Sequence, residues 1–318
     1  MSESIDHEFS TAVAPLRGAL RLDCYRMLGS AHDSDDLVQE TLLRAWRSRH
    51  TLLDRTRLRP WLYRIATHAC FDELARRPKR VLASDLQPAA DPRADAAPPI
   101  DEAVWLEPMP DAWLGNAAGD PDARYTLRES VALAFVAALQ VLSPAQRAAL
   151  LLRDVVGLSA DETAAALEQS VSATNSALHR ARTAIDEKVA REGPEAFATT
   201  PQDQAVLAAY VRAIAECDVE AMIALMHDDL HTTMPPSPTW IAGRAANEVF
   251  YRKMFARWRL GDVKLVPLGA NGQHGFAFWR EGSVRAIEVV ELRDGLIARV
   301  HHFMQPGLVP LFVDQRDT

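Results

Sequence analysis

The sequence predicts a multidomain protein in which two all-α domains precede an α+β domain with a curved antiparallel sheet. In residues 7–80 and 124–191 apolar side chains recur at helical spacing. The segment 81–123, which is rich in proline and acid, separates these two blocks. In residues 202–318 helical patterns come first, and short strands joined by tight turns follow, which is typical of an α+β domain whose sheet wraps a cone-shaped cavity.

Length and composition narrow the class of protein. A chain of 318 residues with 48% hydrophobic content favours two or three domains. No run approaches the roughly 18 to 20 apolar residues of a membrane span, and the beginning of the chain lacks the features of a secretory signal. We therefore expect a cytoplasmic protein without a membrane partner. The three cysteines form no C-x-x-C pattern, so we expect neither disulfides nor a metal site.

The formal net charge of −8 is concentrated in one segment. Residues 81–123 contain one Arg against nine Asp and Glu, and eight of the 19 prolines fall within residues 78–121. Proline interrupts both helices and the hydrogen bonding of β-sheets, and the like charges of the acids repel one another. This segment is therefore predicted to be an extended acidic linker. The helical blocks on either side are close to neutral or basic, which leaves nucleic-acid binding open to them.

In the first block, "DSDDLVQETLLRAWRS" predicts a helix capped by Asp33, Ser34 or Asp35. A second helix is predicted from Pro60, after a basic loop. Arginines and aromatic residues beside them suit single-stranded nucleic acid, although a solvated helix face is the simpler alternative. This basic and aromatic group comprises Arg44, Arg47, Arg49, Arg55, Arg57, Arg59, Trp61, Tyr63 and Arg64.

The second block predicts a helix-turn-helix. "SPAQ" and "SADE" are capping boxes at Ser143 and Ser159, and Ser170 or Ser172 can cap the last helix. The predicted inward face of that helix consists of Thr174, Leu178, Ala181 and Ile185. The predicted outward polar face consists of Ser172, Asn175, Ser176, His179 and Arg180, with Arg182 on its flank. A packing unit of three helices without DNA affinity is the alternative.

The third block predicts helices at about 203–216, 219–227 and 244–257, followed by four strands. The strands "DVKLVPLGA", "HGFAFWR", "SVRAIEVVEL" and "LIARVHHFM" are separated by Asn271-Gly272, Glu281-Gly282 and Asp294-Gly295, which favour hairpins.

Several polar residues of this third block are candidates for a site. "HDDLH" at 227–231 is close to a zinc-protease motif, but His227 is expected to end a helix and His231 to begin an extended segment, which argues against a metal. Adjacent His301 and His302 should point to opposite faces of a strand. The candidate pocket comprises Trp240, Phe278, Glu288 and His302. A hydrogen-bonded core histidine is the alternative to acid-base chemistry there.

Four strings, taken in order, resemble regions 2 and 4 of extracytoplasmic-function sigma factors of RNA polymerase. They are "DSDDLVQETLLRAW", "RPWLYRIATHACFDELARR", "LSPAQRAALLLRDVVGLSADETAAAL" and "SVSATNSALHRAR". Further strings, "WLEPMPD" and "MPPSPTW", are similar to members that carry a C-terminal SnoaL-like domain. The resemblance implies region 2 at 7–80, the linker at 81–123, region 4 at 124–191 and the SnoaL-like domain at 202–318.

The resemblance also implies partners and site residues. Six residues are expected to contact the clamp helices in the largest subunit of core RNA polymerase. They are Asp35, Asp36, Leu37, Gln39, Glu40 and Leu43. The residues expected to bind the melted −10 element of promoter DNA are Arg55, Arg57, Arg59, Trp61, Arg64 and His68. Those expected in the major groove of the −35 element are Ser172, Asn175, Ser176, His179 and Arg180, with Arg182 near phosphate.

This chain departs from the family in places. Many relatives have Asn at His68, Gly at Glu168, and Lys or Arg at Asn175 and Ala177. Fewer cations weaken the attraction to phosphate, so we expect region 4 alone to bind DNA poorly and core polymerase to supply the remaining affinity.

These observations predict a sigma factor without enzymatic activity or cofactor. We expect the C-terminal domain to modulate it in cis, with a small ligand in the cone as a candidate and no separate anti-sigma factor required. Two alternatives remain at this stage. One is a ligand-responsive helix-turn-helix regulator that acts without polymerase, and the other is a SnoaL-like isomerase or cyclase tethered to DNA.

Overall fold

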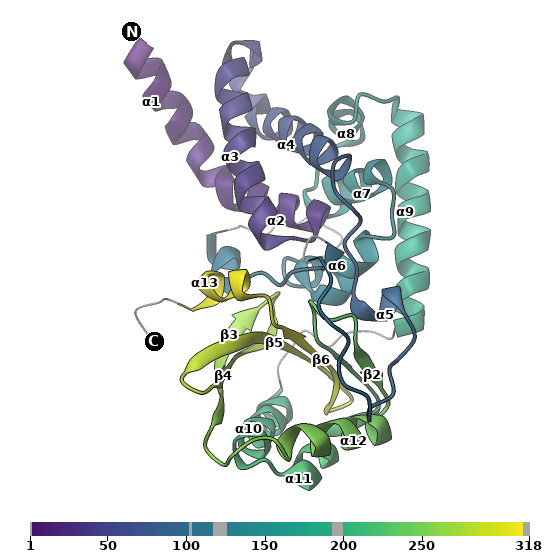
Figure 1. Ribbon diagram of the computed structural model, residues 1–318. Coiled ribbons are helices and arrows are strands. Elements are labelled where there is room, and N and C mark those ends of the chain that lie inside the picture. The colour runs from purple at the N-terminus through teal and green to yellow at the C-terminus, as the bar shows by residue number, and fades with distance from the viewer. Residues whose placement is uncertain (1, 102–103, 117–125, 193–199, 314–318) are drawn as a thin grey trace. The chain divides into compact units, whose positions relative to one another are not determined.

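The computed structural model describes residues 2–101, 104–116, 126–192 and 200–313 (Figure 1). The chain divides into two compact units. The first contains Met1–Arg80 and Asp111–Gly193, and the second contains Val81–Pro110 and Pro194–Thr318. Most of the acidic segment therefore belongs to the same unit as the C-terminal domain. The part of that segment at 117–123 lies outside the described residues.

The first unit is helical. Its α-helices are α1 (Ser2–Val13), α2 (Arg17–Leu28), α3 (Ala31–Ser48), α4 (Leu58–Leu74), α6 (Leu133–Leu139), α7 (Pro144–Leu150), α8 (Ala160–Ala166) and α9 (Val171–Glu192). Shorter turns are η1 (Ala14–Leu16), η2 (Arg49–Thr51), η3 (Arg55–Arg57), η5 (Asp111–Asn116), η6 (Glu129–Val131) and the π-helical η7 (Leu151–Val155). The prediction of two helical blocks is confirmed, and α9 is the long helix that ends the second of them (Figure 1).

Local capping chemistry explains most helix boundaries. Ser143 and Ser159 form the capping boxes that the sequence predicts. Ser170 caps α9, because its hydroxyl accepts the Ala173 amide at 3.2 Å. The predicted cap of α3 is wrong. Ser30 takes that position and accepts the Asp33 amide at 3.1 Å, because the helix begins at Ala31 and Asp33 already lies inside its first turn.

Helix α4 begins at Leu58, two residues before Pro60, so the predicted start is also displaced. The reason is the turn η3, which brings the chain into helical geometry earlier. Asp54 caps this turn by accepting the Thr56 amide at 2.9 Å. Pro60 still lies in the first turn of α4, where its missing amide hydrogen costs no hydrogen bond.

Buried arginines join the two halves of the first unit. Arg26 on α2 donates to the carbonyl of Ser130 at 3.0 Å and to its hydroxyl at 2.7 Å. Arg147 on α7 donates to the carbonyl of Met27 and to Gln140 Oε1. Burial lowers the pKa of Arg147 to about 10. Removing the hydroxyl of Ser130 or the side-chain oxygen of Gln140 would leave a buried guanidinium with fewer acceptors, which is costly.

The second unit is an α+β domain. Its helices are α5 (Ala83–Leu86), α10 (Pro201–Glu216), α11 (Val219–Ala224), α12 (Arg244–Phe255), η8 (Pro306–Leu308) and α13 (Val309–Phe312). Its strands are β1 (Met226–Thr233), β2 (Trp240–Ala242), β3 (Val263–Ala270), β4 (Gln273–Arg280), β5 (Ser283–Arg293) and β6 (Leu296–Phe303). They form one sheet in the order β2-β1-β6-β5-β4-β3, in which only the β1 and β6 pair is parallel among the described strands.

The predicted meander is confirmed in β3 to β6. Asn271, Glu281 and Asp294 have φ values of 57°, 52° and 53°, and a glycine follows each of them in the left-handed region. This pair of positive φ values matches the tight hairpin turn that suits the twist of antiparallel strands. The curved sheet carries α10, α11 and α12 on one face (Figure 1), with Tyr210, Tyr251 and Phe276 in the core between them.

Strands β1 and β2 are not among the predicted strands. Because β1 begins at Met226, His227 lies within a strand and does not end a helix, which corrects the sequence-based expectation. Among the described residues no helix combines the length and apolar character needed to cross a membrane.

Candidate nucleic-acid interface

Helix α9 has one buried face and one polar face. Thr174, Leu178, Ala181 and Ile185 are all buried, as the spacing predicts. They pack the helix against α7 and α8, which fixes its orientation within the helix-turn-helix. The opposite face is therefore held outward by a rigid support.

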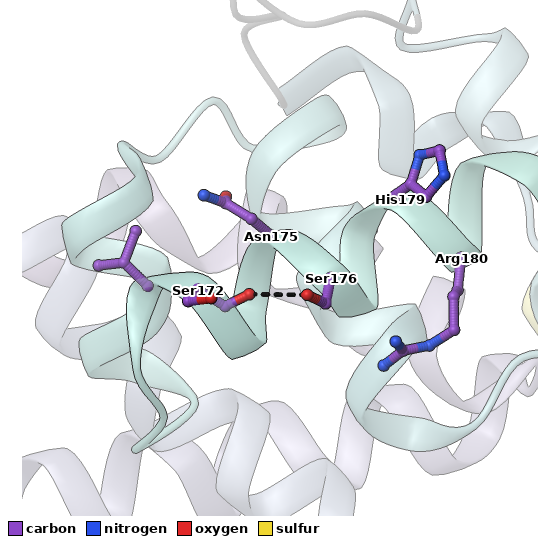
Figure 2. Close-up of a pocket in the computed structure, with 6 residues that line it drawn as sticks. Ser172, Asn175, Ser176, His179 and Arg180 are labelled. Carbon is purple, nitrogen blue, oxygen red and sulfur yellow. Dashed lines mark hydrogen bonds between the residues drawn. The ribbon is translucent and has the colours of Figure 1, made fainter.

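The polar face is a shallow hollow lined by Val171 and five polar residues (Figure 2). The five polar residues are Ser172, Asn175, Ser176, His179 and Arg180, and all of them are exposed. The hydroxyl of Ser176 donates to the carbonyl of Ser172 at 2.9 Å. Amide, imidazole and guanidinium groups on one helix face are the donors and acceptors that read base edges in a major groove.

Two neighbouring residues do not join this polar face. Ala177 is buried, so a Lys or Arg at this position would point into the packing and would add no cation to the surface. Arg182 donates from Nε to Asp154 Oδ2 at 2.8 Å. Asp154 lies in η7 and is buried, so Arg182 holds α9 against the preceding segment. The role near phosphate predicted for Arg182 competes with this ion pair.

The turn between α8 and α9 contains Glu168, which has φ of 54°. Its carboxylate lies 2.7 Å from Arg64 Nη2 and 3.7 Å from His68 Nε2. The hydrogen bond from Arg64 and the charges of His68 and Arg64 lower the pKa of Glu168. Glu168, in the turn of the helix-turn-helix, thus contacts the helix predicted to hold the melted strand.

The residues predicted for the −10 element lie on η3 and α4. Arg55 and Arg57 are exposed, and Arg55 pairs with Glu8 at 2.9 Å. Arg59 donates to the carbonyl of Val156. Trp61 is partly buried and donates to Thr51 at 3.2 Å.

Tyr63, the other aromatic residue in the basic group, is fully buried and cannot stack on a base. Burial raises the pKa of its hydroxyl well above the usual range. The expectation that Tyr63 contributes to a stacking surface is therefore wrong, and Trp61 remains the aromatic candidate there.

Helix α3 carries the predicted polymerase-binding residues. Asp35, Asp36, Gln39, Glu40 and Leu43 are at least partly exposed, and Leu43 has half of its surface accessible. Leu37 is buried and can act only by shaping the helix. The face thus offers an exposed leucine among acidic and amide side chains.

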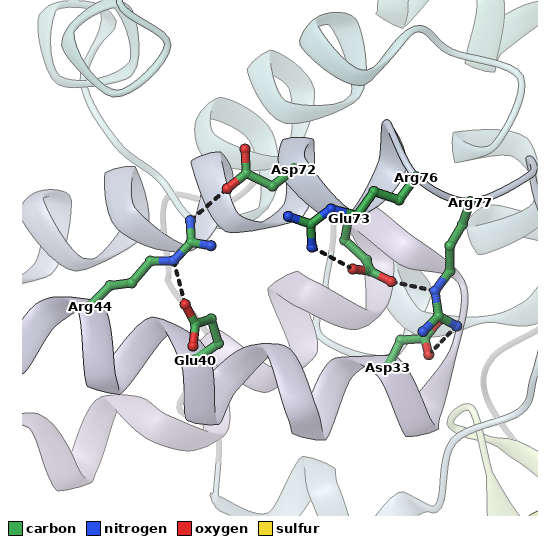
Figure 3. A network of polar contacts seen from close by, with 7 residues as sticks. All are labelled: Asp33, Glu40, Arg44, Asp72, Glu73, Arg76 and Arg77. Carbon is green, nitrogen blue, oxygen red and sulfur yellow. Dashed lines mark hydrogen bonds and ion pairs between the residues drawn. The ribbon is translucent and has the colours of Figure 1, made fainter.

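Ion pairs fix the spacing of α3 and α4 (Figure 3). Arg44 bridges Glu40 at 2.8 Å and Asp72 at 2.7 Å. Asp33 contacts Arg77 at 2.8 Å, and Arg80 binds the other oxygen of the same carboxylate at 2.7 Å. Glu73 contacts both Arg76 and Arg77. Asp33, in the first turn of α3, thus binds two arginines that follow α4.

The second unit contains a separate cavity of about 530 Å³. Phe278 and His302 line it, and Glu288 lies behind His302 with Oε2 2.8 Å from Nδ1. Trp240 does not join them. Its indole donates to the carbonyl of Gln87 at 2.7 Å, so it contacts the acidic segment instead.

His301 and His302 contact different groups, as predicted for neighbours on a strand. His301 lies against Thr233 and Glu291. In "HDDLH", His227 lies 3.0 Å from Arg293 and His231 lies 3.1 Å from Arg299. These arginines make the surroundings of both rings unfavourable to a cation, and the described residues include no cluster of metal ligands.

A rigidly supported polar helix in a helix-turn-helix, with an arginine-bearing turn and helix in the same unit, is an arrangement that suits a DNA-reading protein. Three known protein families match successive parts of the chain. Sigma-70 region 2 matches residues 16–80, Sigma-70 region 4 matches 132–185, and the SnoaL-like domain matches 207–300.

Similar proteins agree with this assignment. The ECF RNA polymerase sigma factor SigG of Mycobacterium tuberculosis H37Rv is 39% identical over 96% of this chain and 83% of its own length. The probable ECF RNA polymerase sigma factor SigI of the same strain is 23% identical over 89% and 88% of the two chains. The crystal structure of SigJ from M. tuberculosis has the same fold, with a TM-score of 0.62 at 22% identity over 96% and 98% of the two chains. The chain belongs to the ECF RNA polymerase sigma factor family and carries a SnoaL-like C-terminal domain.

Proposed function

We propose that this chain, acting in the cytoplasm without catalysis of its own, binds core RNA polymerase and directs it to promoters whose −35 element α9 reads. The observation that supports this proposal best is the polar face of α9. Five polar side chains are exposed on it while the opposite face is buried. The packing of the buried face gives the helix one orientation, and the exposed donors and acceptors allow it to recognise base edges.

The proposal assigns separate tasks to the other helices. The exposed residues of α3, with Leu43 among them, contact the clamp helices of polymerase. Arg55, Arg57 and Trp61 contact the melted −10 strand, together with Arg64 and His68 once Glu168 releases them. Because Arg180 is the one Lys or Arg among the five polar residues of the polar face, the affinity of α9 for DNA depends on the simultaneous binding of α3 to polymerase.

A transcription experiment with a randomised promoter library tests this assignment. Core polymerase with the chain should enrich a two-part motif among sequenced transcripts, and core polymerase alone should not. The double variant Asn175→Ala and Arg180→Ala should weaken the preference in the upstream part about tenfold and leave the downstream part unchanged.

The matched control is Gln204→Ala with Arg212→Ala, which removes two exposed side chains of similar kind from α10. The control should enrich the same motif as the native chain. DNA binding that is as strong and as selective without polymerase would favour the regulator alternative and would contradict the sigma proposal.

We also propose that the C-terminal domain modulates the sigma domains in cis by holding the acidic segment. Three hydrogen bonds from backbone amides of the acidic segment support this. The amides of Ala90 and Ile100 donate to the carbonyls of Trp240 and Pro236 at 2.9 and 3.0 Å. The Ala97 amide donates to Thr239 at 2.8 Å.

Side chains add to this attachment. Lys253 on α12 donates to the carbonyls of Arg93 and Ala94 at 2.9 and 2.8 Å and pairs with Asp95 at 2.8 Å. Near the end of the segment, Met109 and Asn271 exchange two hydrogen bonds, at 2.9 and 3.0 Å. The segment is thus fixed at several points along its length, so its release is a discrete event that can change transcription.

The full-length variant Lys253→Met tests this second proposal, because it removes three contacts from the acidic segment at once. Run-off transcription from the enriched promoter should change by about threefold or more relative to the native chain. Lys264→Met is the matched control, since the ammonium of Lys264 lies over the ring of Trp279 and contacts no part of the segment in the described residues. Equal transcription by Lys253→Met, Lys264→Met and the native chain would contradict the proposal.

A further inference from the structure

The first helix of the chain, α1, contacts two of the candidate residues for the melted strand. Glu8 on α1 pairs with Arg55, with 2.9 Å between Oε2 and Nη2. The next residue, Phe9, contacts two indoles. Its ring centroid lies 5.6 Å from that of Trp46 and 6.4 Å from that of Trp61. Two adjacent side chains of α1 therefore occupy a cation and an aromatic surface, the two kinds of group that bind single-stranded nucleic acid.

The two indoles come from different helices and share one neighbour. Trp46 lies near the end of α3, and Trp61 lies in the first turn of α4. The ring of Phe9 is inclined by 65° to the first indole and by 89° to the second, the edge-on geometry that aromatic rings favour. All three rings are partly buried. Departure of Phe9 would open the part of both indoles that it covers to another flat ring.

Contacts that do not involve α1 hold the indoles in place. Trp61 Nε1 donates to Thr51 Oγ1 at 3.2 Å, and the same hydroxyl donates to the carbonyl of Ser48 at 2.8 Å. The guanidinium of Arg49 lies over the ring of Trp46, 4.0 Å from its centre, and donates to the carbonyl of that residue at 2.8 Å. These partners belong to α3 and to the turn η2 that follows it. The indoles therefore keep their positions when α1 leaves.

Helix α1 carries the same sign of charge as nucleic acid. Residues 2–13 contain three Asp and Glu and no Lys or Arg, whereas residues 49–57 contain three Arg and one Asp. A carboxylate binds a guanidinium as a phosphate oxygen does, and a phenyl ring contacts an indole through the same kind of surface as a base. Glu8 and Phe9 thus present side by side the two groups that a nucleotide presents.

The contacts of α1 are weak enough to be exchanged for others. The side chains of Glu8 and Arg55 are 51% and 79% exposed, and water screens such a pair. A helix of 12 residues is marginal in water by itself, so α1 depends on its contacts with the rest of the helical unit. A strand that takes over these contacts should displace α1 and unfold it.

We propose that Trp46 and Trp61 form a binding site for a base of single-stranded DNA, with Arg55 as its phosphate contact. In the free chain, Glu8 and Phe9 of α1 occupy this site, so α1 competes with DNA. The inference deepens the proposed function and rests on it for the identity of the strand, the melted −10 element. It adds Trp46 to the residues that bind the strand.

Binding of a single strand to the full-length chain, without polymerase, tests the proposal. The probe is a fluorescein-labelled single strand of DNA of mixed sequence and about 12 nucleotides. It is titrated at low salt, where phosphate contacts are strongest, and followed by fluorescence anisotropy. The release variant, Glu8→Gln with Phe9→Ala, should bind it about fivefold more tightly than the native chain, because no competitor has to be displaced.

The matched control is Glu216→Gln with Phe312→Ala. It makes the same two changes at an exposed Glu and a partly buried Phe of the second unit, and it alters the net charge equally. The control should bind the strand like the native chain.

Further variants show whether the effect acts through the site. Glu8→Gln alone should strengthen binding in the native background but not in the Arg55→Gln background, where the carboxylate has no guanidinium to occupy. Trp46→Leu keeps an apolar side chain but no ring, so it should weaken binding by the release variant severalfold. Trp46→Phe should restore part of that loss, because a ring is present again.

Hydrogen exchange of the native chain follows α1 itself. A saturating single strand should speed exchange at the amides of Phe9 and Ala12 severalfold, because the displaced helix unfolds. The amide of Ala213 on α10 is the internal control and should not change. A strand that bound over an undisplaced α1 would slow the exchange of its amides instead.

Equal affinity of the native chain and the release variant would overturn the proposal, as would the absence of saturable binding by the release variant. Exchange in α1 that the strand leaves unchanged or slows would also overturn it. If Glu8→Gln strengthened binding equally in the Arg55→Gln background, net charge would explain the effect and the site would be rejected. Failure of the proposed function has a different signature, because core polymerase with the native chain would then enrich no promoter motif, whether or not a single strand displaces α1.

Discussion

Arg64 Nη2 lies 2.7 Å from Glu168 Oε1, so a residue in the turn of the helix-turn-helix contacts the helix that carries the candidate residues for the melted strand. Both side chains are about half exposed, and exposed pairs contribute little to stability because water screens them. The importance of this contact therefore lies in which groups it occupies. While it persists, Arg64 is not free to bind phosphate.

Replacement of Glu168 separates the backbone effect from the ion pair. Glu168→Gly should raise the melting temperature by about 2 °C, because glycine adopts a φ of 54° without strain. Glu168→Gln should change it less, since the backbone cost remains and only the ion pair is lost. Calorimetry of the two variants checks this. A lower melting temperature for Glu168→Gly than for Glu168→Gln would mean that the contacts of the longer side chain outweigh the strain.

Two arginines on α9, two positions apart, should differ sharply. Arg182→Met leaves Asp154 buried without its ion-pair partner, so we expect a loss of about 3 kcal/mol in the free energy of unfolding. Arg180→Met removes an exposed side chain and should change stability by less than about 0.5 kcal/mol. Urea unfolding of both variants measures the difference. Equal losses would show that Asp154 does not depend on Arg182.

His231 should make stability depend on pH. Burial and the neighbouring charge of Arg299 lower its pKa to about 4 from the usual 6.5. The folded state therefore resists protonation that the unfolded state accepts, so stability is constant above about pH 6.5 and falls as the pH decreases toward 4. Relative to His231→Gln, the native chain should lose about 1 to 2 kcal/mol over this window, after allowance for the solvent that reaches the ring. Parallel losses in both proteins would assign the effect to another group.

Sequence reasoning succeeds where the determining interactions are local. The capping boxes at Ser143 and Ser159 involve residues three positions apart, and the hairpin turns at Asn271 and Asp294 depend on a dipeptide. The buried face of α9 follows from spacing alone. For these elements, each residue and its interacting partner lie within a few positions of one another in the sequence.

Sequence reasoning fails where a partner far away in the sequence determines the position of a strand or side chain. Strand β1 has the polar sequence "MHDDLHTT", and its position depends on pairing with β6, about 70 residues later. Trp240 is a residue type that often lines pockets, but its indole donates a hydrogen bond to a carbonyl of the acidic segment. Asp33 has the pattern of a helix cap, yet Arg77 and Arg80 bind it. A weak signal was present for Trp240, because "MPPSPTW" is a rigid stretch suited to holding another chain.

The attachment of the acidic segment also sets a length. Residues 87–109 would span about 80 Å if they were fully extended, but the hydrogen bonds that begin at Gln87 and end at Met109 fix them to the C-terminal domain. The chain that joins region 2 to region 4 is therefore much shorter in effect than its sequence. Under the proposed cis modulation, release of the segment would lengthen this tether, and the C-terminal domain would then set how far apart on DNA the two promoter-reading domains can reach.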